Sequence, residues 1–237
     1  MTPLAYASAD AGTTYGATLN PLNHATGSGT LTLALNGNVA TVTERWSGLA
    51  STFGGAPYPH VQHIHIGAKG TCPPGSADKN ADGVVSTTEG APFYGAIGTT
   101  LSVTGDTSPA AATNLKIAPA GASTDYSRTI TLSSDTVSSI QAGTAVIVVH
   151  GLDPTTLSKK AQGEKSDLVP SLPLAATSPA LCGTLTAMPG APQTGYGSTA
   201  GTEDLGLFGL GGSLLAAGAL GMVVARRRTR GAVDAQS

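Results

Sequence analysis

Charged side chains are scarce in this sequence: Asp, Glu, Lys and Arg together make up 11% of its 237 residues, well below the roughly 25% of an average soluble domain. The long charged runs that favour helices are therefore missing. The net charge is −2, and the only basic cluster lies at the extreme C-terminus, which leaves nucleic-acid binding without an electrostatic footprint. A Gly-x-Ser-x-Gly motif is also missing, so nothing indicates a serine hydrolase.

Glycine, threonine, serine and alanine take the place of the charged residues, and short Thr- and Val-rich runs alternate with turn residues along the chain. β-Branched residues favour strands, and Asn36-Gly37 is typical of a two-residue hairpin turn. The pattern predicts an all-β fold, a Greek-key or Ig-like sandwich or barrel of about eight strands, with no internal helix. The predicted strands span residues 14–19, 29–35, 39–46, 61–67, 99–104, 126–132, 145–150 and 182–187. Two long stretches, 68–97 and 152–180, are predicted to be loops.

The chain divides into a folded part and two ends of different composition. We expect residues 11–187 to form a single β domain, because about 175 residues suit one domain with its own core better than two. Residues 1–10 end in small residues at Ala-x-Ala spacing and resemble the end of a signal peptide; a flexible alanine-rich terminus is the alternative. Residues 188–204 are rich in Gly, Pro, Ser and Thr, which predicts a linker that cannot bury a core.

The C-terminal region carries a predicted membrane anchor. From Leu205 to Ala225 the chain has no charged residue over 21 positions, and as a helix this stretch would be about 31 Å long, close to the hydrocarbon thickness of a bilayer. The basic tail, residues 226–237, contains four arginines, which predicts that it is cytoplasmic and that the domain faces outward. We therefore expect a single-pass protein on the extracellular face of the membrane or in the cell wall. A buried core helix is the alternative.

The linker contains a segment from Ala191 to Gly195 whose sequence, Ala-Pro-Gln-Thr-Gly, resembles the Leu-Pro-x-Thr-Gly motif of sortase substrates. Such proteins also end in an apolar stretch and basic residues. The first position departs from the motif, and the spacer before the apolar stretch is long. Covalent attachment to the cell wall is therefore an alternative to plain membrane anchoring, which is favoured.

The segment from Asp78 to Glu89 follows the spacing of a twelve-residue Ca²⁺ loop, with oxygen-bearing side chains at positions 1, 3, 5, 9 and 12 and a glycine at position 6. Ca²⁺ prefers six to eight oxygen ligands, and a terminal bidentate Glu completes such a set. The predicted ligands are Asp78, Asn80, Asp82, the carbonyl of Val84, Ser86 and Glu89. We expect a lone loop with non-helical flanks in which Ca²⁺ serves stability. An Asp- and Gly-rich surface turn is the alternative.

Four of the five histidines fall in two short segments. His63 and His65 lie two residues apart, so on a strand they share a face, and His150 ends another predicted strand. Three imidazoles from two neighbouring strands make a nitrogen site that is compatible with Cu²⁺ and Zn²⁺ alike. The alternative is a set of core histidines that form hydrogen bonds without a metal. His60 has the opposite parity and is expected to lie outside the cluster.

Cys72 and Cys182 are the only cysteines. In an exported protein an even number of cysteines predicts a disulfide. A bridge that closes a loop of about 110 residues contributes up to about 4–5 kcal/mol in the chain-entropy account, and here it would tie the Asp78 loop to the last strand. Two free thiols are the alternative.

Residues 15–185 resemble the CHRD domain, a module named after chordin that also occurs in bacterial surface proteins. The resemblance rests on Gly-Leu at Gly48, on His-x-His-x-Gly beginning at His63, and on Val-Val-His ending at His150, followed by a final Gly-x-Leu. Cys182 stands where the family commonly has an arginine. The resemblance implies an Ig-like or Greek-key β fold, and it implies no settled biochemical activity.

The chain is more faintly similar to Cu/Zn superoxide dismutase. That family shares a His-x-His strand leading to a cysteine, a later Val-Val-His, and a Cys-Gly pair near its end, and here these stand in the same order. The similarity implies that His63, His65 and His150 correspond to copper ligands. No histidine lies between His65 and His150, so the metal-bridging and zinc ligands are missing, and Pro179 replaces the arginine that guides the substrate. Efficient dismutation is therefore not expected.

Two functions follow from these features. The favoured one is a non-enzymatic surface module, a calcium- and disulfide-stabilised CHRD-like domain that binds an unidentified surface ligand. The alternative is an extracellular copper-binding protein related to superoxide dismutase, which holds its metal on the three histidines.

Overall fold

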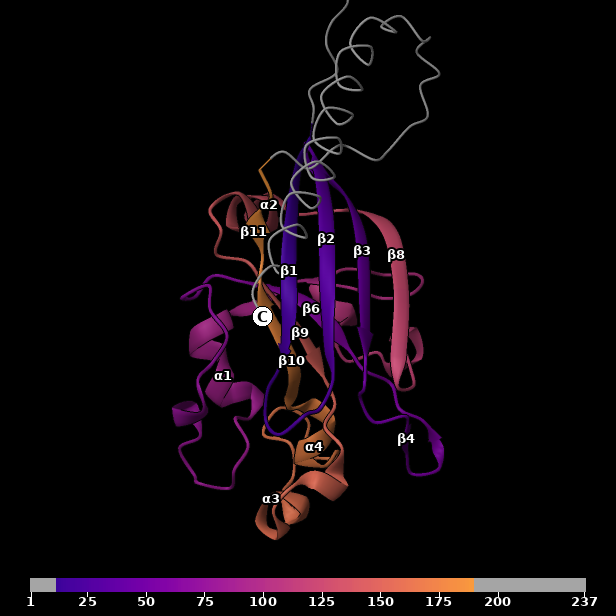
Figure 1. Ribbon diagram of the computed structural model, residues 1–237, viewed down its shortest axis with the longest axis vertical. Helices are drawn as coiled ribbons and strands as arrows, with labels where there is room; N and C mark the ends of the chain where they lie inside the picture. Colours follow the sequence, from indigo (N-terminus) through magenta and orange to yellow (C-terminus); the bar gives the residue numbers. More distant parts are fainter. Residues whose placement is uncertain (1–11, 190–237) are drawn as a thin grey trace, which may run out of the picture. The chain divides into compact units, whose positions relative to one another are not determined.

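A computed structural model describes residues 12–189, which fold into a domain built mainly of strands (Figure 1). This confirms the prediction of a mostly β fold. Within the described residues the strands are β1 (Thr13–Pro21), β2 (Ser28–Asn36), β3 (Val39–Ser47), β4 (Thr52–Phe53), β5 (Ala56–Pro57), β6 (Gln62–Ile66), β7 (Ala96–Thr100), β8 (Ser123–Thr131), β9 (Val146–His150), β10 (Pro179–Thr184) and β11 (Thr186–Ala187).

Nine of these strands form one antiparallel sheet that curls into a half-barrel (Figure 1). Its order is β7-β6-β9-β10-β1-β2-β3-β8, with β11 paired to β1, while β4 and β5 pair only with each other. β1 pairs with β2 along most of its length and with β10 near its end. It therefore joins a first half, made of β1, β2, β3 and β8, to a second half made of β7, β6, β9 and β10.

The two halves of the sheet bury their residues differently. In β2 the leucines Leu31, Leu33 and Leu35 face the core while the residues between them are exposed, as burial on one face requires. Each such leucine contributes about 1.5–3 kcal/mol when it is removed from water. In β9 all five residues are buried, because one face lines the core and the other packs against Tyr94 and its neighbours. The candidate site lies on this second, covered face.

Most predicted strands agree with the structure to within three residues. The strand predicted at 99–104 instead spans Ala96–Thr100. It ends early because the chain leaves the sheet after Thr100. There the amide of Thr100 donates to the carbonyl of Thr107, and its hydroxyl donates to the carbonyl of Ser108. The last predicted strand, 182–187, is divided between β10 and β11.

The prediction of a domain without internal helices is wrong. The described residues contain four α-helices and four short 3₁₀ helices: α1 (Thr87–Tyr94), α2 (Ser134–Gln141), α3 (Lys159–Gly163), α4 (Leu174–Thr177), η1 (Gly75–Ala77), η2 (Pro109–Ala111), η3 (Leu115–Ile117) and η4 (Pro154–Thr156). α1 begins inside the predicted Ca²⁺ loop, so the expected non-helical flank is helical. Ser86 and Glu89 form a capping box, in which each side chain accepts from the other residue's backbone N–H, and this local bonding outweighs the presence of Pro92 in the helix.

The predicted disulfide between Cys72 and Cys182 is present, and it joins residues 110 positions apart. It fastens the segment that carries η1 and α1 to β10. The cysteines lie in a small apolar cluster with Tyr94, Val146 and Val148, on the covered face of the second half of the sheet.

Several sequence predictions fall outside the described residues: the signal-like stretch 1–10, the sortase-like segment from Ala191 to Gly195, the membrane segment from Leu205 to Ala225, and the basic tail 226–237. Among residues 12–189, no helix combines the length and the apolar character needed to cross a membrane.

Candidate metal centre

The three histidines singled out in the sequence meet on the covered face of the sheet. His63 and His65 point to the same side of β6, and β6 pairs with β9, where His63 lies opposite Val148. His150, two residues further along β9, therefore lies beside them. The imidazole ring centres are 5.3 Å apart for His63 and His150, 5.6 Å for His63 and His65, and 6.0 Å for His65 and His150. β6 and β9 lie side by side in Figure 1.

Each ring is held by one hydrogen bond to a backbone carbonyl. His63 Nε2 lies 3.1 Å from the carbonyl oxygen of Ala112, His65 Nδ1 lies 2.9 Å from that of Gly95, and His150 Nδ1 lies 2.6 Å from that of Thr177. A carbonyl only accepts hydrogen bonds, so each of these nitrogens carries the hydrogen. The second nitrogen of each neutral ring is therefore left with a lone pair.

The three carbonyls come from the ends of helical segments. Gly95 follows α1, Ala112 follows η2, and Thr177 ends α4. The last carbonyls of a helix have no partner within the helix, so they are free to accept from side chains. The helices absent from the sequence prediction thus supply the groups that orient the rings.

The remaining ring nitrogens, His63 Nδ1, His65 Nε2 and His150 Nε2, are buried and have no hydrogen-bond partner. The ligand atoms of the three histidines all lie within 4.8 Å of one another. In the described part of the chain they form the one group of three or more His, Cys, Asp or Glu residues placed closely enough to hold a metal ion. Buried polar atoms without partners are rare in folded proteins, and here three of them converge.

Burial keeps the three rings neutral. It lowers the pKa of His65 to about 3 and that of His150 to about 4, and it lowers the pKa of His63 well below its ordinary value, where the two neighbouring rings add to the effect. A metal ion needs the neutral imidazole. Protons therefore compete weakly for these lone pairs at neutral and mildly acidic pH.

The segment that carries η1 and α1, which the disulfide fastens to β10, covers the site. The ring of Tyr94, at the end of α1, packs edge-on against His65 with centres 4.5 Å apart, and its hydroxyl donates to the carbonyl of Thr87. The next residue, Gly95, has φ of 91°, and a Cβ there would lie 1.9 Å from the carbonyl oxygen of Ile66. Only glycine fits, so Gly95 is what allows its own carbonyl to reach His65.

His60 lies outside the cluster, as its parity predicted, but its ring contacts the backbone of His150. Its ring is fully buried, and its two nitrogens each lie 2.9 Å from a backbone carbonyl oxygen, one of His150 and one of Ala50. Sequence parity gave no signal for this role, because the contact is to the backbone of His150 and not to its side chain.

The oxygens of the Asp78 loop have partners of a different kind. Asp78 accepts from the amides of Ala81 and Gly83, and Asp82 accepts from the amide of Val84. One carboxylate oxygen of Glu89 accepts from the amide of Lys79 and the other from that of Ser86. The loop is therefore closed by its own backbone amides, and Ca²⁺ binding there stays a prediction.

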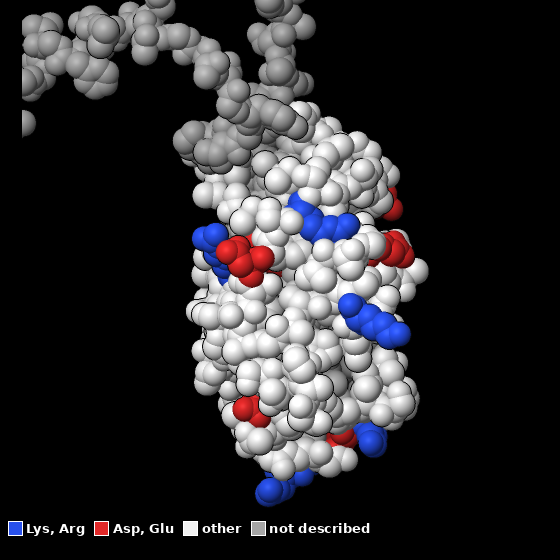
Figure 2. Space-filling view, turned by 90° about the vertical axis from the view of Figure 1, so that its right-hand side faces the viewer, with Lys and Arg blue, Asp and Glu red and all other residues white. Residues whose placement is uncertain are grey.

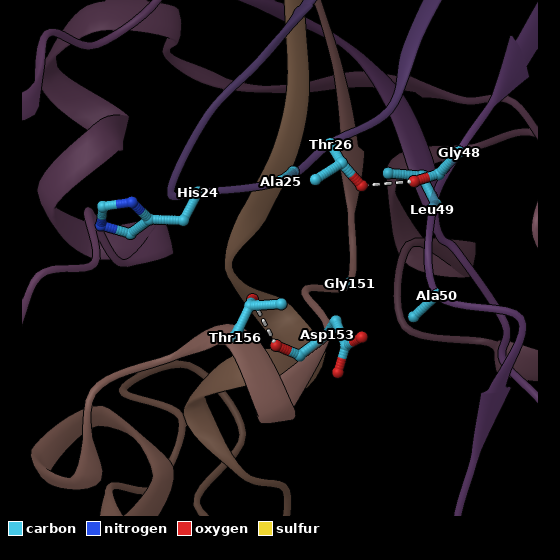
Figure 3. Close-up of a pocket in the computed structure, with 9 residues that line it drawn as sticks. All are labelled: His24, Ala25, Thr26, Gly48, Leu49, Ala50, Gly151, Asp153 and Thr156. Carbon is cyan, nitrogen blue, oxygen red and sulfur yellow. Dashed lines mark hydrogen bonds between the residues drawn. The ribbon is translucent and has the colours of Figure 1, made fainter.

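The surface of the domain has a small hollow of about 90 Å³ (Figure 3), well below the ~300–1,000 Å³ of typical small-molecule sites, and a larger, more open hollow of about 680 Å³ over β1, β2 and β10 that no histidine lines. In Figure 3 the ring of His24 points away from Asp153, so the two do not converge on a common ligand. The face shown in Figure 2 carries only scattered charges among large uncharged areas. None of the three clustered histidines lines this hollow.

Comparisons with known proteins add no identification: no protein-family model matches the chain, and no curated protein matches it. The CHRD and superoxide dismutase resemblances therefore rest on the motifs alone.

Proposed function

We propose that this protein is a metal-binding protein that holds one copper or zinc ion on His63, His65 and His150. One observation carries the proposal: each of three clustered, buried imidazoles has a ring nitrogen without a hydrogen-bond partner, and ligand nitrogens of the three rings lie within 4.8 Å of one another. Leaving one buried polar atom unpaired costs about 1–3 kcal/mol. A single ligand bound by all three ring nitrogens would remove this cost at each of them. Each nitrogen offers a lone pair and no hydrogen, which suits a metal ion.

The residues of the chain fit this task. Three neutral imidazoles are ligands that copper and zinc both accept. The carbonyls of Ala112, Gly95 and Thr177 fix which nitrogen of each ring faces the ion, as outer partners do at metal sites generally. A bound ion would supply a localised positive charge, while Tyr94 and the disulfide-linked segment exclude water from it.

We further propose that the domain works outside the cell. The disulfide supports an oxidising compartment, and the uncharged segment from Leu205 to Ala225 with its basic flank supports a membrane anchor. Sortase attachment at the segment from Ala191 to Gly195 is a variant of the same proposal.

Calcium at the Asp78 loop is a separate proposal with a stabilising role. Its support is the ligand spacing from Asp78 to Glu89. A CHRD-like binding role toward a surface ligand rests on the sequence resemblance and does not depend on either metal.

Metal analysis of the full-length chain, purified in a mild detergent, tests the proposed function. After incubation with Cu⁺ or Zn²⁺ and removal of excess ion, we expect close to one ion per chain. His63→Ala should lose it, and His24→Ala, which removes the exposed histidine, should keep it. Wild-type protein without bound metal, or equal loading of His63→Ala, would contradict the proposal. Circular dichroism of each variant establishes that it is folded.

A further inference from the structure

The three ligand nitrogens are enclosed. The side chains of His63, His65 and His150 are 2–3% exposed, and the nitrogens that face one another are themselves buried. Solvent therefore does not reach the point at which an ion would sit. An ion at this point would take its ligands from the protein alone.

Three imidazoles are the donors that the described residues bring to this point. In the described part of the chain, no other His, Cys, Asp or Glu joins the group. The hydroxyl of Tyr94, the nearest aromatic neighbour, is already used in its bond to Thr87. Zn²⁺ takes four ligands and catalytic zinc takes a water as the fourth, and Cu²⁺ favours four in a tetragonal arrangement. Cu⁺, a closed-shell ion, is satisfied by three nitrogens in a plane.

The charge of the site also favours a monovalent ion. The three imidazoles are neutral, and no carboxylate or thiolate belongs to the group. Asp167, which lies near Tyr94, accepts from the Ser86 hydroxyl and the Thr88 amide. The cost of taking an ion out of water grows with the square of its charge, so a divalent ion costs about four times as much as a monovalent ion of the same size.

The spacing of the nitrogens is compatible with a planar centre. With metal–nitrogen bonds of about 2.0 Å, three nitrogens in a plane lie about 3.5 Å apart, and in a tetrahedron about 3.3 Å apart. The observed nitrogens lie no more than 4.8 Å apart, which is close enough for a planar centre of this size after a small shift of the rings. Each ring is tethered by a single hydrogen bond, to Ala112, Gly95 or Thr177, which allows such a shift.

We infer that the three-histidine centre is selective for Cu⁺ over Zn²⁺ and Cu²⁺ and holds it as a closed, three-coordinate ion. The inference rests on the proposed function and adds the identity of the ion. It also assigns the centre to binding and shielding Cu⁺, since the enclosure that favours this ion leaves no place for a substrate beside it.

Anaerobic competition titrations of the full-length chain test the selectivity. Cu⁺ is titrated against bicinchoninate, and Zn²⁺ against a coloured zinc chelator. We expect Cu⁺ to bind at least about 100-fold more tightly than Zn²⁺, as the uncompensated charge of a divalent ion implies. X-ray absorption should show three nitrogen neighbours, and the loaded protein should remain silent in electron paramagnetic resonance after exposure to air.

A charge-altering variant sharpens the test. His150→Asp supplies an anionic ligand and should shift the preference toward Zn²⁺, because the carboxylate compensates the second charge. His24→Ala, the matched control at an exposed position, should keep the wild-type preference. His150→Ala should weaken both ions if His150→Asp does not fold.

The possible outcomes separate the two proposals. Protein that binds neither ion overturns the proposed function itself. Protein that binds Zn²⁺ as tightly as Cu⁺, or that gives a stable Cu²⁺ resonance signal in air, overturns the selectivity and leaves the metal centre standing. Cu⁺ preference with three nitrogen neighbours, lost in His150→Asp, supports both.

Discussion

Two segments of this chain, the strand with His63 and His65 and the loop from Asp78 to Glu89, both show metal-ligand spacing in sequence, yet their donor atoms end in opposite situations. In the loop, the oxygens of Asp78 and Glu89 accept hydrogen bonds from backbone amides. In the histidine centre, the facing nitrogens have no partner at all. The loop oxygens thus already have hydrogen-bond partners within the protein, whereas the facing nitrogens of the histidine centre have none. Spacing alone does not distinguish these cases.

A third region shows that an unpaired atom by itself does not make a metal site. Glu44 of β3 is fully buried, and both its carboxylate oxygens lack partners, as does the hydroxyl of Tyr126 opposite it on β8. Burial raises the pKa of Glu44 to about 8, against a smaller lowering by the Gln62 side chain, so this acid relieves its burial by taking up a proton. The histidines do not take this route, because a proton removes the charge of a buried carboxylate but adds a charge to a buried imidazole.

The largest expected effect is on the affinity of the histidine centre for Cu⁺. His65→Ala should lower Cu⁺ affinity by more than about 1,000-fold, since it leaves two ligands where three are needed. Asp78→Ala should change that affinity less than about threefold, because it removes no ligand. Competition titration measures both. A large loss of Cu⁺ binding in Asp78→Ala would show that the two regions are one functional unit.

Removal of the disulfide should affect both regions. Cys72→Ala combined with Cys182→Ala is expected to cost about 4–5 kcal/mol of unfolding free energy, as for a closed loop of about 110 residues. Cu⁺ should also bind more weakly, because the segment that ends in Tyr94 and Gly95 loses its anchor. Urea unfolding and titration measure these effects. If the double variant does not fold, the wild-type chain reduced with a dithiol serves instead, and undiminished stability would contradict the expectation.

Changes of pH should separate the histidines from Glu44. The pKa of Glu44 is raised on folding, so its contribution is fully present below the unfolded value near 4.5 and is lost as pH rises through about 8. Between pH 5 and pH 7.5 the unfolding free energy should fall by roughly 3 kcal/mol as this contribution is lost. Glu44→Gln should flatten this alkaline loss in urea titrations. An unchanged slope would contradict the assignment.

The histidines should lower the stability of the protein as pH falls, whereas Glu44 should lower it as pH rises. Their pKa values are lowered on folding, so their contribution is present above pH 6.5 and is lost as pH falls toward 3–4. His65→Gln should reduce this acid sensitivity, and bound Cu⁺ should move the loss to lower pH. Thermal unfolding across pH 3–7 in the presence and absence of Cu⁺ provides the measurement. Acid sensitivity that does not change in His65→Gln would contradict the role of the ring.

The smallest expected effect is in the loop. Glu89→Ala removes one half of the capping box and should cost about 1 kcal/mol without calcium. If the loop binds Ca²⁺, the ion should raise the melting temperature of the wild type but not that of Glu89→Ala. Equal melting temperatures with calcium and with EGTA, for the wild type and both Asp78→Ala and Glu89→Ala, would remove calcium from the description.

The sequence was informative where a feature depends on residues that are close together in the chain. Alternation of apolar and polar residues predicted most strands, and the spacing of His63 and His65 predicted a shared face. The helix α1 was missed because Ser86 and Glu89 begin it through reciprocal capping, a local signal that the nearby Gly and Pro residues obscured. The contact between His60 and the His150 carbonyl was missed because it has no periodicity.

The sequence by itself determined the β character of the domain, the pairing of its two cysteines, and the three histidines that could share a metal, since each depends on residue type and on spacing along the chain. Tertiary structure decided which nitrogens lack partners. That outcome depends on three carbonyls at the ends of separate helical segments, on the Gly95 backbone that only glycine permits, and on a cover held by Cys72 and Cys182. These groups are distant in sequence, and only folding places them around one point.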